Sequence, residues 1–430
     1  MTPKRTSWWL LAIPIVVLAC GSSNSAGKQS PGGDAGSSEE GGAGEGGALE
    51  EGGMTGGDGS SPSGNNVAPL VVDNGPAGAG GSVDVSFISV TLCIPGTTTC
   101  QTIDHVSVDT GSSGLRILAS ELPSGFTLPQ PNATTGSPLG ECFTFDDGFT
   151  WGSVRSADVK IAGEIAAKIP LQLIDPNYAT VPSDCSSTGS PENTLADFGA
   201  KGIIGINQII PDCGSYCADT TVQPGGYYSC TGTTCADVAV AISAQVSNPI
   251  AFFASDSNGA VLEFPAIPAT GAKTLAGSLI FGIGTASNNA LGSASVQTVD
   301  EYGNFTTIFN GQTLTTSYID SGTNSLSFND SAIAQCSDGS GYFCPTSTVN
   351  LTAENKGLNG VTAMVSFSVA NTDTLFGNGS DTAFDDLATV YGTSDSTTFA
   401  WGFPFFIGRN VYIGLDGAMT TGGKGPYVAY

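Results

Sequence analysis

The chain has 430 residues, enough for two or three units of ordinary domain size. It carries 12 Lys and Arg against 38 Asp and Glu, which gives a formal net charge of −26. This charge argues against nucleic acid and against an anionic membrane surface as direct partners. It fits solubility alone, and equally it fits work in acid, where many carboxylates are neutralised.

Residues 1–19 have the features of an export signal. Lys4 and Arg5 form a basic head, and residues 8–18 form an apolar core too short to span a bilayer. The run ends in a Leu-Ala-Cys sequence at Cys20, which resembles a bacterial lipobox without a following Asp. The resemblance implies lipidation of Cys20 and an outer-membrane lipoprotein, periplasmic or surface-exposed. The alternative is an ordinary secretory signal with an incidental Cys.

Residues 20–66 consist of Gly, Ser, Ala and acidic residues with almost no large apolar side chains. Such a stretch cannot bury enough surface to fold, so we expect a flexible tether that holds the body off the membrane. The chain would therefore contact the membrane only through the lipid on Cys20.

From Val67 the composition becomes typical of a folded domain. Apolar residues alternate in residues 83–90 and 103–108, and Gly, Pro and Thr separate such runs. The same pattern continues to Tyr430. It predicts an all-β fold with a few short helices, of which residues 236–246 show the clearest helical spacing.

The cysteines indicate a disulfide framework. Of the 11 cysteines, ten remain if Cys20 is lipidated, and an even set in an exported chain is typical of disulfides. We expect bridges within three pairs: Cys93–Cys100, Cys336–Cys344 and the longer Cys142–Cys185. The pairing of four clustered cysteines stays open, or they could bind zinc, although their gaps and the oxidising context disfavour a metal site: Cys213, Cys217, Cys230 and Cys235.

The single histidine, His105, limits the chemistry of the chain. A Ser-His-Asp triad would have to use it, and a zinc site with several His ligands is excluded. His105 lies four residues before Asp109, so strand alternation would place both on one face. We expect a structural or rim role for it.

Two segments share one pattern around an aspartate. Residues 108–115 read Val-Asp-Thr-Gly-Ser-Ser-Gly-Leu, and residues 319–326 read Ile-Asp-Ser-Gly-Thr-Asn-Ser-Leu. Each is an apolar strand that ends in an Asp, a Gly and hydroxyl residues. One copy is a weak signal, because strand-turn junctions are rich in such residues. Two copies in matched apolar contexts, each with Leu at the same spacing, are a much stronger one.

The residue types fit acid–base chemistry on a water molecule. If Asp109 and Asp320 face each other, they share a proton, so that one acts as base and the other as acid. A Gly after the Asp lets backbone approach closely, and a following hydroxyl can orient a carboxylate. No metal and no cofactor is required.

These motifs resemble those of the pepsin-like aspartic peptidases, and the resemblance extends over Val67 to Tyr430. Residues 198–206 resemble the segment that threads behind the first Asp loop, followed by a strand at 250–253 and another at 260–264. Residues 401–416 resemble the family's C-terminal segment. The resemblance implies two β-rich lobes related by a pseudo-twofold axis, with the cleft between them: residues 67–265 with Asp109 and residues 266–430 with Asp320.

Within that fold, the sequence also resembles a bacterial family of uncharacterised exported proteins, for example in residues 102–106 and 281–292. That family implies no assigned substrate.

The resemblance assigns roles to residues of both loops. Asp109 and Asp320 match the catalytic pair, which implies an extended peptide or protein substrate, and we expect a monomer. Thr110 and Ser321 match the buried hydroxyls that cross-link the two loops. Gly111 and Gly322 match the glycines that let water and substrate approach. Ser112 and Thr323 match the hydroxyls that bond the outer carboxylate oxygens.

The sequence departs from the family at three places. Arg116 stands where the family usually has Trp. The hairpin expected to cover the cleft, residues 143–152, has no Tyr, so Phe145 or Trp151 would have to cover it. Pro404 stands where the threading Gly of the second lobe is expected.

Two functional hypotheses remain. The first is an aspartic endopeptidase that works best in acid. The second is a catalytically silent binding module on the same fold, because fold alone does not establish function. The intact Asp pair with its glycines favours the first hypothesis, and the altered hairpin favours the second.

Overall fold

The computed structural model describes residues 64–146, 148–377, 379–392 and 397–430. The signal segment 1–19, the lipidation site Cys20 and nearly all of the tether 20–66 lie outside the described residues. The described part consists mostly of β-strands with short helices, which confirms the predicted all-β class. None of its helices has the length and apolar character needed to cross a membrane.

The strands before residue 265 are these: β1 (Val67–Val72), β2 (Ser86–Cys93), β3 (Cys100–Asp109), β4 (Ser113–Leu118), β5 (Leu139–Thr144), β6 (Gly148–Ile161), β7 (Glu164–Ile174), β8 (Ser190–Pro191), β9 (Gly202–Ile206), β10 (Tyr227–Thr231), β11 (Thr234–Asp237) and β12 (Gly259–Glu263). Those that follow are: β13 (Leu275–Phe281), β14 (Val296–Thr298), β15 (Phe305–Phe309), β16 (Gln312–Ile319), β17 (Leu326–Ser327), β18 (Val349–Lys356), β19 (Thr362–Val369), β20 (Ala388–Thr389), β21 (Ala400–Trp401), β22 (Asn410–Gly414), β23 (Met419–Thr420), β24 (Gly423–Lys424) and β25 (Tyr427–Ala429).

The helices are all short. The α-helices are α1 (Ser183–Ser186), α2 (Leu195–Phe198), α3 (Gly214–Ala218) and α4 (Thr372–Phe376). The 3₁₀ helices are η1 (Ala119–Glu121), η2 (Ile242–Ala244), η3 (Pro249–Phe252) and η4 (Phe403–Phe405).

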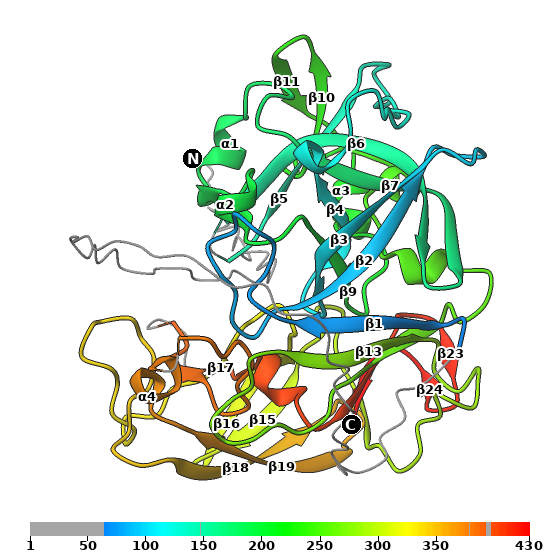
Figure 1. The fold of residues 1–430 in the computed structure, drawn as a ribbon. Helices are drawn as coiled ribbons and strands as arrows, with labels where there is room; N and C mark the ends of the chain where they lie inside the picture. The colour runs from blue at the N-terminus through cyan, green and yellow to red at the C-terminus, as the bar shows by residue number, and fades with distance from the viewer. Residues whose placement is uncertain (1–63, 147, 378, 393–396) are drawn as a thin grey trace, which may run out of the picture.

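The strands form two large sheets, and the first of them extends into both halves of the molecule. The first sheet follows the order β11-β10-β5-β6-β7-β4-β9-β3-β2-β1-β13-β12-β22-β25-β14, and β8 pairs with β6. The second follows β19-β18-β15-β16-β21-β17-β20, and β23 pairs with β24. Figure 1 shows β2–β11 in one half, β15–β19 in the other, and β1 with β13 between them. The predicted boundary after residue 265 falls between β12 and β13, within the sheet that both halves share.

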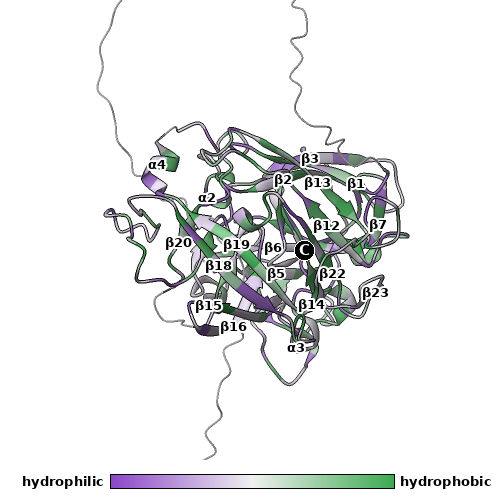
Figure 2. Ribbon diagram, turned by 90° about the horizontal axis from the view of Figure 1, so that it is seen from below, coloured by the Kyte–Doolittle hydropathy of each residue, from purple (hydrophilic) through white to green (hydrophobic). Residues whose placement is uncertain are grey.

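The core lies along both sheets, because apolar residues alternate with polar ones on strands that are half-exposed. In β1, for example, Ala68, Leu70 and Val72 are buried and alternate with more exposed residues. Strands β12 and β13 of the shared sheet are largely hydrophobic in Figure 2. In the second half the rings of Phe328 and Phe399 stack at 4.7 Å. These rings adjoin β17 and β21, the strands that pair next to the second Asp loop.

The predicted helix at residues 236–246 is wrong. Residues 236 and 237 belong to β11, which pairs with β10 next to the Cys230–Cys235 disulfide. Further on, the backbone N–H of Val246 donates to the Tyr227 hydroxyl at 2.7 Å. These long-range contacts outweigh a helical spacing of apolar residues. The strand expected at 250–253 is also absent, because Pro249 and the Asn248 cap begin the 3₁₀ helix η3 there.

Five disulfides join the ten described cysteines. Three have the predicted pairing: Cys93–Cys100, Cys142–Cys185 and Cys336–Cys344. The four clustered cysteines pair locally as Cys213–Cys217 and Cys230–Cys235. Their sulfurs are therefore bonded to each other, and the zinc alternative is excluded for this cluster.

Candidate active site

The first Asp loop is held by strands that come from three places in the chain. Asp109 is the last residue of β3, which runs parallel to β9, with Asp109 opposite Gly205. Strand β9 also pairs with β4, so it passes between the two arms of the loop. A Cβ at Gly205 would lie 2.5 Å from the carbonyl carbon of Ser112. Only Gly permits this close approach of backbone to backbone.

The second Asp loop has the same construction. Asp320 directly follows β16, which runs parallel to β21, and its N–H donates to the Trp401 carbonyl at 2.9 Å. A Cβ at Gly402 would lie 2.0 Å from the Ser325 carbonyl oxygen. The threading glycine of this lobe is therefore Gly402, and the expectation that placed Pro404 at this position is wrong. Pro404 lies instead in the 3₁₀ helix η4.

The two loops are cross-linked by a reciprocal pair of hydrogen bonds. The backbone N–H of Thr110 donates to the Ser321 hydroxyl at 3.1 Å, and that of Ser321 donates to the Thr110 hydroxyl at 2.9 Å. Each hydroxyl donates onward to a carbonyl across the interface, Ser321 to Val108 at 2.8 Å and Thr110 to Ile319 at 3.4 Å. The symmetry of these bonds fixes one loop against the other.

Removing one of these hydroxyls is expected to weaken the junction. Ser321→Ala leaves the Thr110 N–H and the Val108 carbonyl buried without their partner. The expected cost is about 1–3 kcal/mol of unfolding free energy. Urea unfolding measures it, with Ser321→Thr as the control that keeps a hydroxyl. Equal stability of the two variants would contradict the role of the hydroxyl.

The carboxylates of the two loops have matching hydrogen bonds. In the first loop, Asp109 Oδ1 accepts from Gly111 N–H at 2.6 Å, and Oδ2 accepts from the Ser112 hydroxyl. In the second, Asp320 has the same partners at equivalent positions. Its Oδ1 accepts from Gly322 N–H at 2.8 Å and its Oδ2 from the Thr323 hydroxyl at 2.8 Å.

The carboxyl group of Asp320 lies against the first loop. A Cβ at Gly111 would lie 2.7 Å from Asp320 Cγ and 2.7 and 2.8 Å from its two oxygens. Position 111 therefore admits only Gly while Asp320 occupies this place. Because Gly111 also donates to Asp109, the two carboxyl groups meet on either side of this residue.

Burial disfavours the charged form of both groups. Asp109 is 0% exposed and Asp320 is 1% exposed. Burial raises the pKa of Asp109 above its ordinary value, although bonds from Ser112 and Gly111 oppose this rise. Burial raises the pKa of Asp320 to about 6. Both carboxyl groups therefore tend to keep a proton at acidic pH.

The two aromatic residues expected over the cleft are buried elsewhere. Trp151 is fully buried, and its indole N–H donates to the Ala179 carbonyl at 3.1 Å. Its ring packs edge-on against Tyr228 at 5.5 Å. Phe145 is 2% exposed and packs against Phe143 at 5.0 Å. Neither ring presents a free face to a substrate, so we assign no covering role to them.

A small cavity adjoins the Asp loops. It has a volume of about 40 Å³ and is lined on the loop side by Val108, Gly322 and Asn324. Its other wall includes Phe198 and Ile203, which belong to the segment at residues 198–206. The sequence analysis placed this segment behind the first Asp loop, where β9 lies, but it did not predict the cavity, because the lining combines residues from distant parts of the chain.

His105 lies away from the chemistry. Its Nδ1 is 2.9 Å from Asp104 Oδ2, its Nε2 is 3.3 Å from Asp73 Oδ2, and its ring packs 5.3 Å from Phe87. Its backbone has φ of 52°, so the strand is locally irregular at this residue. These contacts indicate a structural role for His105, which links β3 to Asp73 and to Phe87 of β2 at the rim of the molecule.

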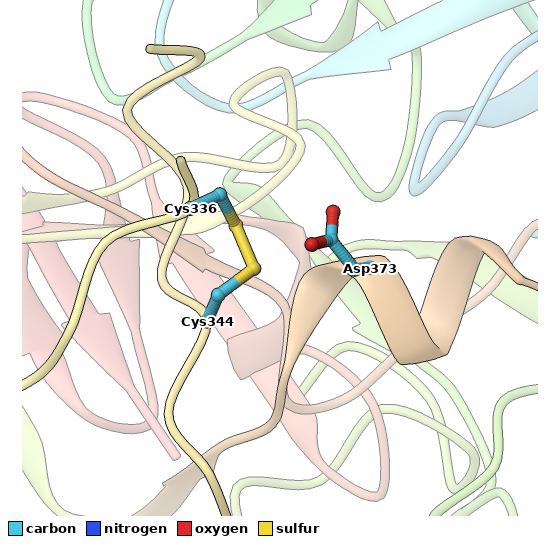
Figure 3. A group of neighbouring side chains, drawn as sticks. All are labelled: Cys336, Cys344 and Asp373. Atoms are coloured by element: carbon cyan, nitrogen blue, oxygen red, sulfur yellow. A yellow bond between two sulfur atoms is a disulfide. The ribbon is translucent and has the colours of Figure 1, made fainter. Parts of the chain in front are cut away.

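In the described part of the chain, one group of potential metal ligands lies close together. It contains Cys336, Cys344 and Asp373 of α4. Figure 3 shows that the two sulfurs are bonded to each other beside the Asp373 carboxylate. A disulfide offers no thiolate, so this group lacks the donors that a metal centre requires.

The comparisons with known proteins identify a family. A search of the curated proteins finds no match. Among solved structures, the chain is similar to the crystal structure of an aspartic proteinase from Irpex lacteus, with 13% identity and a TM-score of 0.47. That alignment covers 84% of this chain and 96% of the other. The family model described as "Protein of unknown function (DUF3443)" matches residues 62–430. The chain therefore belongs to the DUF3443 family of proteins of unknown function.

Proposed function

We propose that this protein is an exported, lipid-anchored aspartic endopeptidase. The observation that carries the proposal is the pair of loops with equivalent hydrogen bonds, which bring two buried aspartates together. Each carboxylate accepts one backbone N–H and one hydroxyl, and each has a raised pKa. No other group of the described chain combines two such carboxyls with a cross-linked backbone frame.

The proposed reaction is the attack of water on a peptide carbonyl. The ionised carboxylate takes a proton from the water, and the protonated carboxyl gives its proton to the carbonyl oxygen. The tetrahedral intermediate then collapses, and a proton passes to the leaving nitrogen. No bond forms between the chain and the substrate. Because one carboxyl must keep a proton, activity is expected to fall as the pH rises past about 6, the pKa of Asp320.

The location of the enzyme is part of the proposal. The Leu-Ala-Cys sequence at Cys20 supports a lipid anchor, and the Gly-rich residues 20–66 support a tether of variable length. Substrates would then be extended protein segments in the bacterial envelope, periplasmic or outside the outer membrane.

Replacing either aspartate by asparagine is expected to abolish cleavage. Asp109→Asn and Asp320→Asn keep the size of the side chain but remove the titrating group, so kcat/KM should fall by about 10³-fold or more. The measurement is cleavage of a mixed peptide library from pH 3 to 8 by residues 64–430, with pepstatin as inhibitor. The control is Asp338→Asn, an exposed aspartate in a turn.

The outcomes separate the two functional hypotheses. Cleavage that peaks in acid and is lost in both variants, but not in the control, supports the peptidase. If the folded, disulfide-complete protein cleaves no peptide at any pH, the peptidase proposal is wrong. The altered hairpin would then support a binding module.

A further inference from the structure

Arg116 is a buried cation directly behind the first Asp loop. It lies on β4, seven residues after Asp109, and its side chain is 0% exposed. Its Nη1 donates to the Ser113 carbonyl at 2.8 Å, which is part of the same loop. Its Nη2 donates to Glu141 at 2.8 Å and to Asp212 at 2.6 Å.

The network around Arg116 extends to two further elements. The guanidinium carbon lies 3.4 Å from the centre of the Phe143 ring on β5. Asp212 accepts from the Tyr227 hydroxyl of β10 at 2.7 Å. Burial and the neighbouring Glu141 raise the pKa of Asp212 well above its usual range. This rise favours the neutral form of Asp212, and the carboxyl groups of both Asp212 and Glu141 contact Arg116.

The second Asp loop lacks such a cation. The residue seven positions after Asp320 is Ser327, which is neutral. The two loops thus share their hydrogen bonds to the carboxylates but differ in charge at this one equivalent position. At Asp109, hydrogen bonds from Ser112 and Gly111 and, after them, the charge of Arg116 oppose the rise in pKa that burial causes, whereas at Asp320 only hydrogen bonds oppose it.

We propose that Arg116 is a positioning residue that makes Asp109 the ionised member of the pair and leaves the proton on Asp320. It acts in two ways, through its charge and through the Ser113 carbonyl, which it holds next to Ser112. Since Ser112 bonds Asp109, this contact fixes the orientation of the Asp109 carboxylate. Asp109 then activates the water, and Asp320 protonates the carbonyl oxygen. This inference rests on the proposed function for its chemistry, but not for its test.

The test compares variants that differ in charge within one network. Arg116→Met together with Glu141→Gln removes both charges of the buried pair and leaves no unpaired ion. The titrations of Asp109 and Asp320 are followed by carboxyl carbon NMR, assigned with Asp109→Asn and Asp320→Asn. We expect the Asp109 titration to move to higher pH and that of Asp320 to move less. On the acid side of the pH profile, the ratio of kcat/KM to its plateau value should be about tenfold lower in this variant than in the unsubstituted protein. A change of this size is expected when one opposite-charge contact to a carboxylate is lost.

Glu141→Gln alone is the matched control. It perturbs the same network but keeps Arg116, so the Asp109 titration is expected not to move to higher pH. If the methionine variant does not fold, Arg116→Gln together with Glu141→Gln gives the same comparison, because it keeps a donor side chain at position 116 and lacks both charges. An unchanged Asp109 titration, or an equal shift of both carboxyls, overturns the inference. Expected titrations in a protein that cleaves no peptide would instead overturn the proposed function alone.

Discussion

The substitution Gly402→Ala is expected to destabilise the second lobe strongly. The added Cβ would lie 2.0 Å from the Ser325 carbonyl oxygen and 2.6 Å from that of Thr323. Both atoms belong to the backbone that follows Asp320, so no side-chain rotation relieves the clash. The backbone at Gly402 has φ of −71°, which Ala adopts without strain, so the effect is steric. We expect a loss of at least about 3 kcal/mol of unfolding free energy.

The measurement is urea unfolding together with peptide cleavage at acidic pH. Gly392→Ala is the matched control, because a Cβ there would meet nothing within 4 Å. Since Thr323 donates to Asp320, a Gly402→Ala protein that does fold is expected to lose activity as well. A variant as stable and as active as Gly392→Ala would show that β21 does not thread the second loop as described.

The position of Gly402 shows where sequence reasoning reached its limit. The two Asp motifs were predictable, because each is a continuous segment with its own strand, turn and hydroxyl. The threading glycine is defined instead by the pairing of β16 with β21, which places Ile319 opposite Trp401. That register joins residues about eighty positions apart. A resemblance to a family gives such a place only approximately, and here it gave Pro404.

The same reason explains the other misses. The apolar spacing of residues 236–246 is a local signal, but the disulfide at Cys235 and the Tyr227 hydroxyl decide its conformation from outside the segment. The rings of Phe145 and Trp151 belong to the hairpin that was expected, but its sequence does not say which way they turn. Arg116 was recognised as a departure, whereas its two acidic partners come from other strands and loops.

A buried acidic contact joins the two lobes close to the cavity that adjoins the Asp loops. Asp84, between β1 and β2, is 0% exposed; its N–H donates to the Thr382 carbonyl, and its Oδ1 accepts from Phe384 N–H, both at 2.7 Å. Its Oδ2 has no partner among the described residues. Asp386 is 3% exposed and also has one unpartnered oxygen. Burial raises the pKa of Asp84 well above its usual range, and burial with the neighbouring Asp385 raises the pKa of Asp386 to about 6.

These groups predict a protein that is more stable in acid than at neutral pH. A carboxyl whose pKa is higher in the folded state binds more protons there than in the unfolded chain. Its contribution is complete below the unfolded pKa and is lost as the pH rises through the folded value, here about 6 for Asp386. We expect the unfolding free energy to fall by about 2 kcal/mol or more between pH 4 and pH 7.

Urea unfolding at both pH values measures this. The double variant Asp84→Asn with Asp386→Asn should remove much of the difference in unfolding free energy between the two pH values, because the amides cannot ionise. The control is Glu301→Gln at an exposed position, which should leave this difference unchanged. An unfolding free energy that rises with pH over this range would contradict the prediction. It would mean that an opposite charge stabilises these carboxylates in solution.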